Sequence, residues 1–316
     1  MDKVISQPAA LSTETSNLIR LFHEDCRLRK LVSTMDYIYR AREFCAFLEG
    51  RGRKPLEVDR NDLKAFLAHL QDRGLKYSTI DRLYSCLSAF YEFLIAEDFT
   101  QENPILPFRR RYLRKFKKDN HSETRKLIEV EEASQLINSI LDTRDRCILV
   151  ILLKTGLRVG ELTRIEVGDI DLNRGELRIK PTPKRTNLLV YLDDECISVL
   201  QKWLAARKGR KGSDGPALFL NKSGDRISRR SIEEFTTKHA TRVGLHNPNA
   251  VKLEDKFTPH CTRHFFSTHL IRSGMPMHYV DILRGDTLGD AIGRYIHVDE
   301  RDLRQSYLAH IPRLGI

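Results

Sequence analysis

The sequence predicts a mainly α-helical fold with a small β-hairpin, divided into two domains. Three observations carry this prediction: apolar residues at helical spacing, one pair of short β-type runs, and a basic segment between two apolar blocks. A chain of 316 residues with 41% hydrophobic residues has room for about two domains. We therefore expect a helical domain at residues 14–105, a basic linker at 106–123 and a second domain at 124–316.

In the first domain, apolar residues recur every three or four positions from about residue 18 to residue 96. This spacing predicts four short amphipathic helices. Turn and capping residues mark their ends: Asp59 can cap a helix that begins near Asn61, and Gly74 can end it. The next helix is then expected to begin at Ser78 or Thr79.

The second domain carries one clear β signal. Short β-type runs, Glu176 to Ile179 and Leu188 to Leu192, flank the segment Pro181-Thr182-Pro183. A proline-containing turn between two such runs predicts an antiparallel hairpin.

Basic residues outnumber acidic ones, with 54 Lys and Arg against 43 Asp and Glu and a formal net charge of +11. This excess favours a polyanionic partner, nucleic acid first. The densest cluster is either a solvated arm or a linker that lies along a DNA backbone. If its seven cations all contact phosphates, the logarithm of affinity falls against the logarithm of salt with a slope of roughly −6. They are Arg109, Arg110, Arg111, Arg114, Lys115, Lys117 and Lys118.

The chain shows no sign of secretion, membrane insertion or metal binding. The residues before Ser12 lack a basic stretch followed by an apolar one, and the apolar run from Cys147 to Leu153 is too short for a membrane span. The six cysteines form no CxxC pair and lie near no histidine cluster, so we expect no metal and no cofactor. We expect a cytoplasmic protein whose cysteines are mostly small buried hydrophobes.

Three segments of the second domain carry side chains suited to chemistry. Arg158 follows an apolar helix that ends at Thr155-Gly156, where it either pairs with Glu161 or binds an anion. His260 and Arg263 stand three residues apart, so on a helix they share a face and can hold one anion together. Each segment alone is weak, and the third is a single tyrosine, Tyr295.

Taken in this order, the segments resemble the tyrosine-recombinase family, which includes phage integrases and the Xer recombinases. The match comprises TGLRVGEL, a hairpin lysine, PHCTRH followed by STHL, and a tyrosine 32 residues beyond Arg263. Residues 77–104 are similar to the family's N-terminal core-binding domain. The sequence around PHCTRH and LRGD looks most like that of archaeal integrases. The resemblance implies a C-shaped DNA clamp, with a SAM-like core-binding domain ahead of a catalytic domain.

The resemblance also implies the reaction. Tyr295 would attack a DNA phosphodiester and form a 3′-phosphotyrosine link, with neither metal nor ATP. Arg158 and Arg263 would clamp the non-bridging oxygens, and His260 would assist at the same phosphate. The expected general acid for the leaving 5′ oxygen is a lysine of the hairpin, and we assign this role to Lys184.

Lys180, on the other side of the hairpin turn, is the alternative general acid. Glu161 would brace the Arg158 turn. One position departs from the family pattern: Asp286 stands nine residues before the tyrosine, where a His or Trp is usual. Because a carboxylate beside a scissile phosphate is repulsive unless paired, we hypothesise that Asp286 pairs with a cation such as Arg284 or Arg294.

The implied partner is double-stranded DNA with a specific recombination site, bound by a homodimer or homotetramer. Lys76, Thr79 and Arg82 are expected on the helix face that meets DNA, with a solvated surface as the alternative. Lys180 and Arg185 are further candidates for DNA contacts. The tail after Asp299 is expected to pack on a neighbouring protomer, or otherwise on its own domain.

Site-specific recombination, for integration and excision or for dimer resolution, is therefore the predicted function. A type IB topoisomerase would use similar catalytic residues, but the helical domain ahead of the catalytic one argues for site recognition. The other alternative, a DNA-binding accessory protein without catalysis, is supported only by Asp286.

Overall fold

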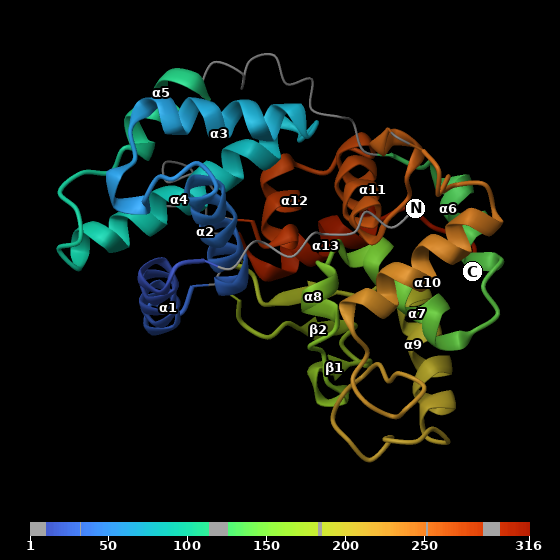
Figure 1. The fold of residues 1–316 in the computed structure, drawn as a ribbon. Coiled ribbons are helices and arrows are strands. Elements are labelled where there is room, and N and C mark those ends of the chain that lie inside the picture. The colour runs from blue at the N-terminus through green and yellow to red at the C-terminus, as the bar shows by residue number, and fades with distance from the viewer. Residues whose placement is uncertain (1–10, 32, 114–125, 183–184, 251, 287–297) are drawn as a thin grey trace. The chain divides into compact units, whose positions relative to one another are not determined.

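The computed structural model of the chain describes all residues except 1–10, 32, 114–125, 183–184, 251 and 287–297 (Figure 1). The chain forms two compact units that divide between His121 and Ser122. Each unit has its own apolar core. The fold is mainly helical with one small sheet, as the sequence predicts.

The first unit is a bundle of helices around an aromatic core, in which Phe22 and Phe90 lie with ring centroids 5.1 Å apart. Asp59 caps its third helix by accepting hydrogen bonds from the N–H groups of Asn61 and Asp62, which confirms the predicted cap. Gly74 follows the end of this helix with a φ of 69°. The helices are α1 (Thr13–Leu28), α2 (Thr34–Glu49), α3 (Arg60–Asp72), α4 (Tyr77–Ala96) and α5 (Ile105–Tyr112).

The first part of the basic segment is helical. α5 buries Ile105 and Phe108 in the core of the first unit, and Arg109 pairs with Asp81 of α4 at 3.0 Å. Arg109, Arg110 and Arg111 therefore belong to this unit and not to a free linker, because the apolar face of α5 fixes them to it. The other cations of the segment lie outside the described residues: Arg114, Lys115, Lys117 and Lys118.

The second unit is built around α7. All side chains from Cys147 to Thr155 are buried, because α6, α9, α10 and α11 pack against this helix. The helices are α6 (Val130–Asn138), α7 (Thr143–Thr155), α8 (Val159–Leu162), α9 (Asp194–Arg207), α10 (Arg229–Arg242), α11 (Pro259–Arg272), α12 (Met277–Arg284) and α13 (Glu300–His310).

A three-stranded antiparallel sheet of order β1-β2-β3 completes the second unit. The predicted hairpin is confirmed: β2 (Glu176–Arg178) pairs with β3 (Leu189–Tyr191), with Leu177 opposite Val190. The sequence did not predict β1 (Ile170–Asp171), because two residues show no alternation. Lys184 lies in the hairpin connection, outside the described residues.

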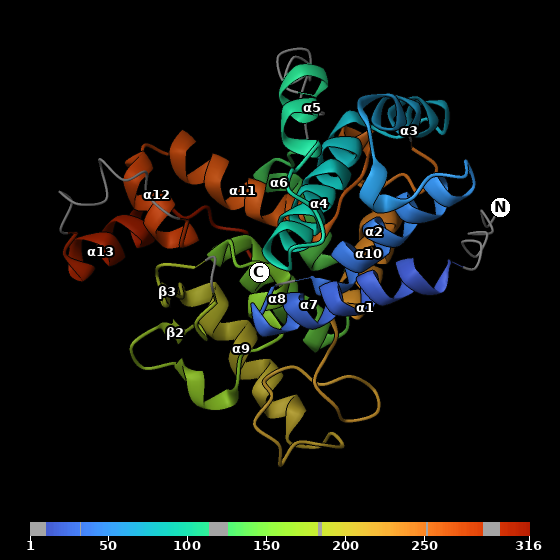
Figure 2. The same ribbon diagram turned by 60° about the vertical axis from the view of Figure 1, so that its left-hand side comes forward.

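The C-terminal residues pack on their own unit, beside α11 and α12 (Figures 1 and 2). Tyr307 of α13 is buried, and its Oη donates a hydrogen bond to the carbonyl oxygen of Lys154 at 3.0 Å. Beyond α13, the N–H groups of Leu314, Gly315 and Ile316 donate hydrogen bonds to the carboxylate of Glu195. Packing on the same domain, the second expectation for the tail, is the arrangement in this chain.

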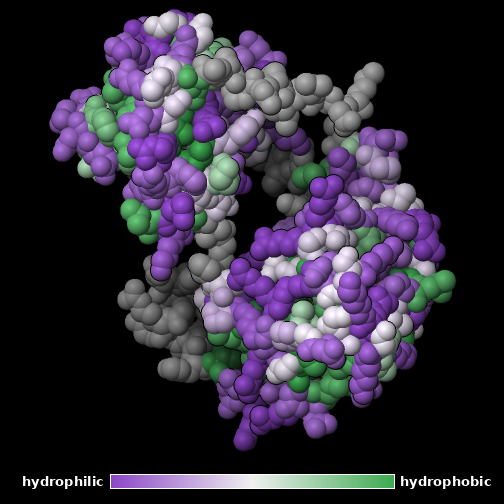
Figure 3. All heavy atoms as spheres, turned by 60° about the horizontal axis from the view of Figure 1, so that its bottom comes forward, coloured by the Kyte–Doolittle hydropathy of each residue, from purple (hydrophilic) through white to green (hydrophobic). Residues whose placement is uncertain are grey.

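The cysteines agree with the expectation that most of them are buried. On the face in Figure 3, hydrophilic residues cover most of both units and hydrophobic ones form small patches. All six cysteines are buried and unpaired. Among the described helices, none combines the length and the apolar character that a membrane span requires.

Candidate active site

Arg158 reaches the site because α7 ends at Gly156. This glycine has a φ of 61°, and a Cβ atom there would lie 2.4 Å from the ring of Phe266. After the turn, the backbone N–H of Arg158 donates to Oε2 of Glu161 at 2.8 Å and its Nη1 donates to Oε1 at 3.0 Å. The predicted pair is present, and it fixes the direction of the Arg158 side chain.

α11 contributes Arg263 and His260 from its first two turns. Arg263 is only 4% exposed, and its Nη1 donates a hydrogen bond to the carbonyl oxygen of Gly156 at 2.6 Å. Its Nη2 donates to the carbonyl oxygen of Arg284 at 3.0 Å. His260 is exposed, one turn away from Arg263. The guanidinium of Arg263, near the start of α11, thus contacts both the end of α7 and the end of α12.

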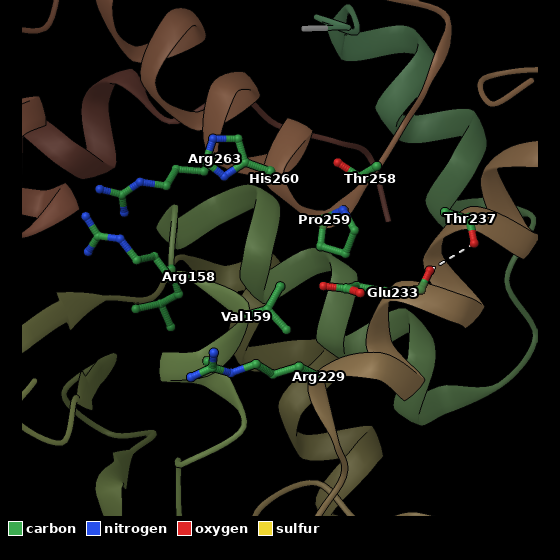
Figure 4. Close-up of a pocket in the computed structure, with 11 residues that line it drawn as sticks. Arg158, Val159, Arg229, Glu233, Thr237, Thr258, Pro259, His260 and Arg263 are labelled. Atoms are coloured by element: carbon green, nitrogen blue, oxygen red, sulfur yellow. Dashed lines mark hydrogen bonds between the residues drawn. The ribbon is translucent and has the colours of Figure 1, made fainter. Parts of the chain in front are cut away.

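The predicted Arg158, His260 and Arg263 line one cavity of about 620 Å³ (Figure 4). In Figure 4 the guanidinium groups of Arg158 and Arg263 lie next to each other, although Arg158 comes from the turn before α8 and Arg263 from α11. The remaining lining residues are Leu157, Val159, Gly160, Arg229, Glu233, Thr237, Thr258 and Pro259.

The carboxylate of Asp286 lies between the two guanidinium groups. Its Oδ1 accepts hydrogen bonds from Nη2 of Arg158 at 2.6 Å and from Nη2 of Arg263 at 2.7 Å. Its Oδ2 is 2.9 Å from Nη2 of Arg284. The hypothesised pairing with Arg284 is present. The sequence did not predict the pairing with Arg158 and Arg263, because 128 residues separate Arg158 from Asp286 and no local pattern links them.

Burial lowers the pKa of Arg263 to about 10, and the positive charge of Arg158 contributes to the lowering while Asp286 opposes it. A guanidinium with this pKa is still cationic at pH 7. Arg263 is buried and Arg158 is half-buried, and two neighbouring cations repel each other unless an anion lies between them. In this structure the anion between them is the carboxylate of Asp286.

Arg185 does not face solvent, and the prediction that it contacts DNA is wrong. Its side chain is fully buried, with Nη1 3.1 Å from Oε2 of Glu161 and Nη2 donating to the carbonyl oxygen of Leu283 at 3.1 Å. Burial is the main cause that lowers its pKa. The residue that follows α12, Gly285, has a φ of 65°, and a Cβ there would lie 2.7 Å from Cγ of Arg185. Arg185 therefore ties the hairpin to α8 and α12.

Lys180 is engaged at the edge of the sheet. Its Nζ lies 3.0 Å from Oδ1 of Asp169 and 3.2 Å from Oε2 of Glu166. The hydrogen bonds to these two carboxylates raise the pKa of Lys180. A lysine held in this way releases its proton less readily, which counts against Lys180 as the general acid. Lys184 and Tyr295 both lie outside the described residues.

The candidates on α4 lie on its first turns. Lys76 is exposed at the N-cap, and Thr79 is half-buried. Arg82 is 66% exposed and forms an ion pair with Asp36 of α2 at 2.8 Å. Lys76 and Arg82 therefore lie at the surface of the first unit, and their contact with DNA stays a prediction.

Sequence reasoning missed Arg229. It stands at the start of α10 outside any motif, yet it lines the same cavity as the predicted residues (Figure 4). Its guanidinium packs on Gly160, where a Cβ would lie 2.3 Å from Nη2. Within the described part of the chain, Arg229 forms no ion pair. The second glycine of TGLRVGEL is the signal that a side chain packs there.

Comparison with known proteins decides the family. Residues 121–302 match the phage integrase family, and residues 19–98 match the phage integrase N-terminal SAM-like domain. The chain belongs to the phage integrase family. Within it, the tyrosine recombinase XerC of Pelotomaculum thermopropionicum is 32% identical over 270 residues, which cover 82% of this chain and 83% of that protein. XerC of Bacillus subtilis is 28% identical over 314 residues, 94% and 97% of the two chains.

Solved structures of integrases share the fold. The Tn1549 transposon integrase in complex with transposon right end DNA has a TM-score of 0.66 and 22% identity, covering 91% of this chain and 97% of that one. A lambda integrase dimer bound to a COC′ core site has a TM-score of 0.65 and 16% identity, covering 92% and 76%. The predicted function is confirmed at family level: this integrase is a tyrosine recombinase, a site-specific enzyme that cleaves and rejoins DNA.

Proposed function

We propose that this recombinase cuts DNA with Tyr295 as nucleophile and Arg158 and Arg263 as the phosphate clamp. The observation that supports the clamp most directly is the convergence of both guanidinium groups on a single carboxylate oxygen, at 2.6 and 2.7 Å. Arginine donors in this arrangement stabilise the extra negative charge that develops on a non-bridging phosphate oxygen during attack.

The neighbouring groups complete the reaction. The P–Oη bond forms as the P–O5′ bond breaks, and His260 at the same phosphate accepts the phenol proton of Tyr295. Glu161 holds Arg158 in position through the hydrogen bonds at 2.8 and 3.0 Å. Lys184 protonates the leaving 5′ oxygen. The 3′-phosphotyrosine then conserves the energy of the broken bond, so that a 5′ hydroxyl from a second strand reverses the step.

The substrate is double-stranded DNA with a specific recombination site, in integration and excision or in dimer resolution, and the enzyme acts in the cytoplasm. The net charge of +11 supports a DNA partner. The lambda integrase that shares this fold is bound to its core site as a dimer. By analogy, we propose a homodimer or homotetramer assembled on DNA.

A covalent-capture experiment tests the nucleophile. The recombination site is first selected from random duplexes by repeated binding, and then supplied as a nicked suicide substrate. We expect the wild-type chain and Tyr279→Phe, the matched control on α12, to form a covalent protein–DNA adduct that survives denaturant. Tyr295→Phe should form none, because it lacks the attacking oxygen. An adduct from Tyr295→Phe would remove this residue from the role.

A further inference from the structure

The clamp of this recombinase is occupied by its own Asp286. We infer that Asp286 competes with the scissile phosphate for Arg158 and Arg263, and so makes strand cleavage depend on how strongly the surrounding site is bound. The inference rests on the proposed roles of the two arginines. It gives a function to Asp286, which stands where the resemblance implies a His or Trp.

The competition follows from the geometry of Oδ1. Both Nη2 atoms donate to this oxygen, at 2.6 and 2.7 Å, which are the lengths of charge-assisted hydrogen bonds. A non-bridging phosphate oxygen would be held by the same two donors at the same distances. Two anionic oxygens cannot share one position, so the carboxylate leaves the clamp before the phosphate enters it.

Arg284 can remain the ion-pair partner of the Asp286 carboxylate after the carboxylate leaves the clamp. Its Nη2 already holds Oδ2 of Asp286 at 2.9 Å, and the side chains of Arg284 and Asp286 are 33% and 28% exposed. The Asp286 backbone is fixed, because its N–H donates to the carbonyl oxygen of Asp281 at 3.2 Å and its own carbonyl oxygen accepts from Thr186 at 3.2 Å. Rotation of the Asp286 side chain about its χ angles is therefore enough to open the clamp.

The consequence is a threshold for cleavage. A DNA segment that fits the rest of the binding surface supplies the free energy to displace the carboxylate, whereas a poorly matched segment leaves Asp286 in place. The free energy of DNA contacts outside the clamp is thus used to move Asp286 away from Arg158 and Arg263. Asp286 is a specificity-determining residue in this scheme, and Arg284 positions it.

The test removes the charge at Asp286 and compares it with an equal change nearby. Asp286→Asn is the test variant, and Asp281→Asn on α12 is the matched control. Binding of inorganic phosphate is measured by isothermal titration calorimetry, and nicking is measured on a supercoiled plasmid of arbitrary sequence. We expect Asp286→Asn to bind phosphate roughly 10-fold more tightly and to nick the plasmid roughly 10-fold faster than wild type. The control should match wild type, and Tyr295→Phe added to Asp286→Asn should abolish the nicking.

Arg284 provides a second, opposite variant. Arg284→Gln removes the alternative partner of the carboxylate, so phosphate binding and nicking should both fall below wild type, and Arg284→Lys should restore them. Wild-type behaviour of Asp286→Asn in both assays would overturn the inference, and so would a loss in both, since Asp286 would then support the clamp instead of closing it. Phosphate binding by Asp286→Asn that survives Arg158→Gln and Arg263→Gln would instead refute the proposed clamp itself.

Discussion

Two arginines at the candidate site of this recombinase are buried. Arg263 and Arg185 are 4% and 6% exposed, and each donates to backbone carbonyl oxygens as well as to a carboxylate. Because guanidinium groups stay charged when buried, every one of them requires such partners. The carboxylate partner of Arg185 is Glu161, which also accepts a hydrogen bond from Arg158.

Replacing Arg185 with methionine tests this dependence. Arg185→Met leaves Glu161 buried without one of its two cations, and breaking a buried pair in this way costs roughly 3–5 kcal/mol. Urea denaturation should show this loss of unfolding free energy. The exposed Arg164→Met is the control and should change stability by less than about 0.5 kcal/mol. A loss below about 1 kcal/mol for Arg185→Met would show that solvent reaches Glu161.

Arg229 should contribute a phosphate contact next to the clamp. We expect Arg229→Ala to weaken DNA binding and to reduce the slope of log affinity against log salt by about 1, because one fewer cation meets the backbone. The neighbouring Arg230→Ala is the control: Arg230 is 88% exposed and is paired with Glu234 at 2.7 Å. Equal salt slopes for Arg229→Ala and wild type would contradict the contact.

At the scale of elements, α7 is the helix on which the second unit is organised. It ends at the Arg158 turn and, one residue before Thr155, it carries the fully buried Lys154. The Lys154 ammonium pairs with Asp193 and Glu195 at the start of α9 and also donates to the carbonyl oxygen of Pro312. One buried cation thus joins α7, α9 and the C-terminal tail.

Docking of the tail should depend on pH through Glu195. Burial raises the pKa of Glu195, but hydrogen bonds from the N–H of Leu314 and from Lys154 outweigh it, so the pKa lies below its usual value. A lowered folded pKa stabilises the docked tail above the unfolded value of about 4.3, and this stabilisation is lost as the pH falls through the folded pKa. Hydrogen exchange of the last three N–H groups, followed by mass spectrometry between pH 7 and pH 3, should show release of the tail only at the acidic end.

Glu195→Gln should reproduce the acid state at pH 7. We expect exchange of the C-terminal N–H groups to be at least about 10-fold faster than in wild type, because the neutral amide is a weaker acceptor and leaves Lys154 with one carboxylate less. Glu234→Gln, which removes an exposed carboxylate of α10, is the matched control. Unchanged exchange in Glu195→Gln would mean that apolar packing of Leu314 alone holds the tail.

At the scale of the molecule, the two units have separate cores and no secondary structure in common. The SAM-like match and the integrase match fall on different units, apart from the integrase match's first residue. If each unit binds DNA, the affinity of the whole chain exceeds that of either unit alone, because the second contact becomes intramolecular.

Separating the units should therefore preserve folding and reduce DNA affinity. A fragment of residues 122–316 should unfold cooperatively, with the helical circular dichroism expected for α6 to α13, because its core is complete. Its affinity for the selected site should fall at least about 100-fold relative to the whole chain. An aggregated or unfolded fragment would show that the first unit is required for the fold of the second.

Patterns within one element were predictable from the sequence. The Asp59 cap, the hairpin pairing and the helical character of both units follow from local spacing and capping, which act over a few residues. α5 was missed, because three consecutive arginines hide an apolar face formed by only Ile105 and Phe108. Arg185 was misassigned, because its burial depends on α8 and α12, far away in the chain.

The sequence by itself determined the fold class, the family motifs and the residue types of the site, since these reside in short segments and their order. It also pointed to two local pairs, Arg158 with Glu161 and Asp286 with Arg284. Only the tertiary structure decided how the charges pair between distant segments. Glu161 joins Arg158 to Arg185, and Asp286 lies between Arg158 and Arg263. Charge pairing depends on distances of about 3 Å between segments as much as 128 residues apart, and no local pattern encodes such a distance.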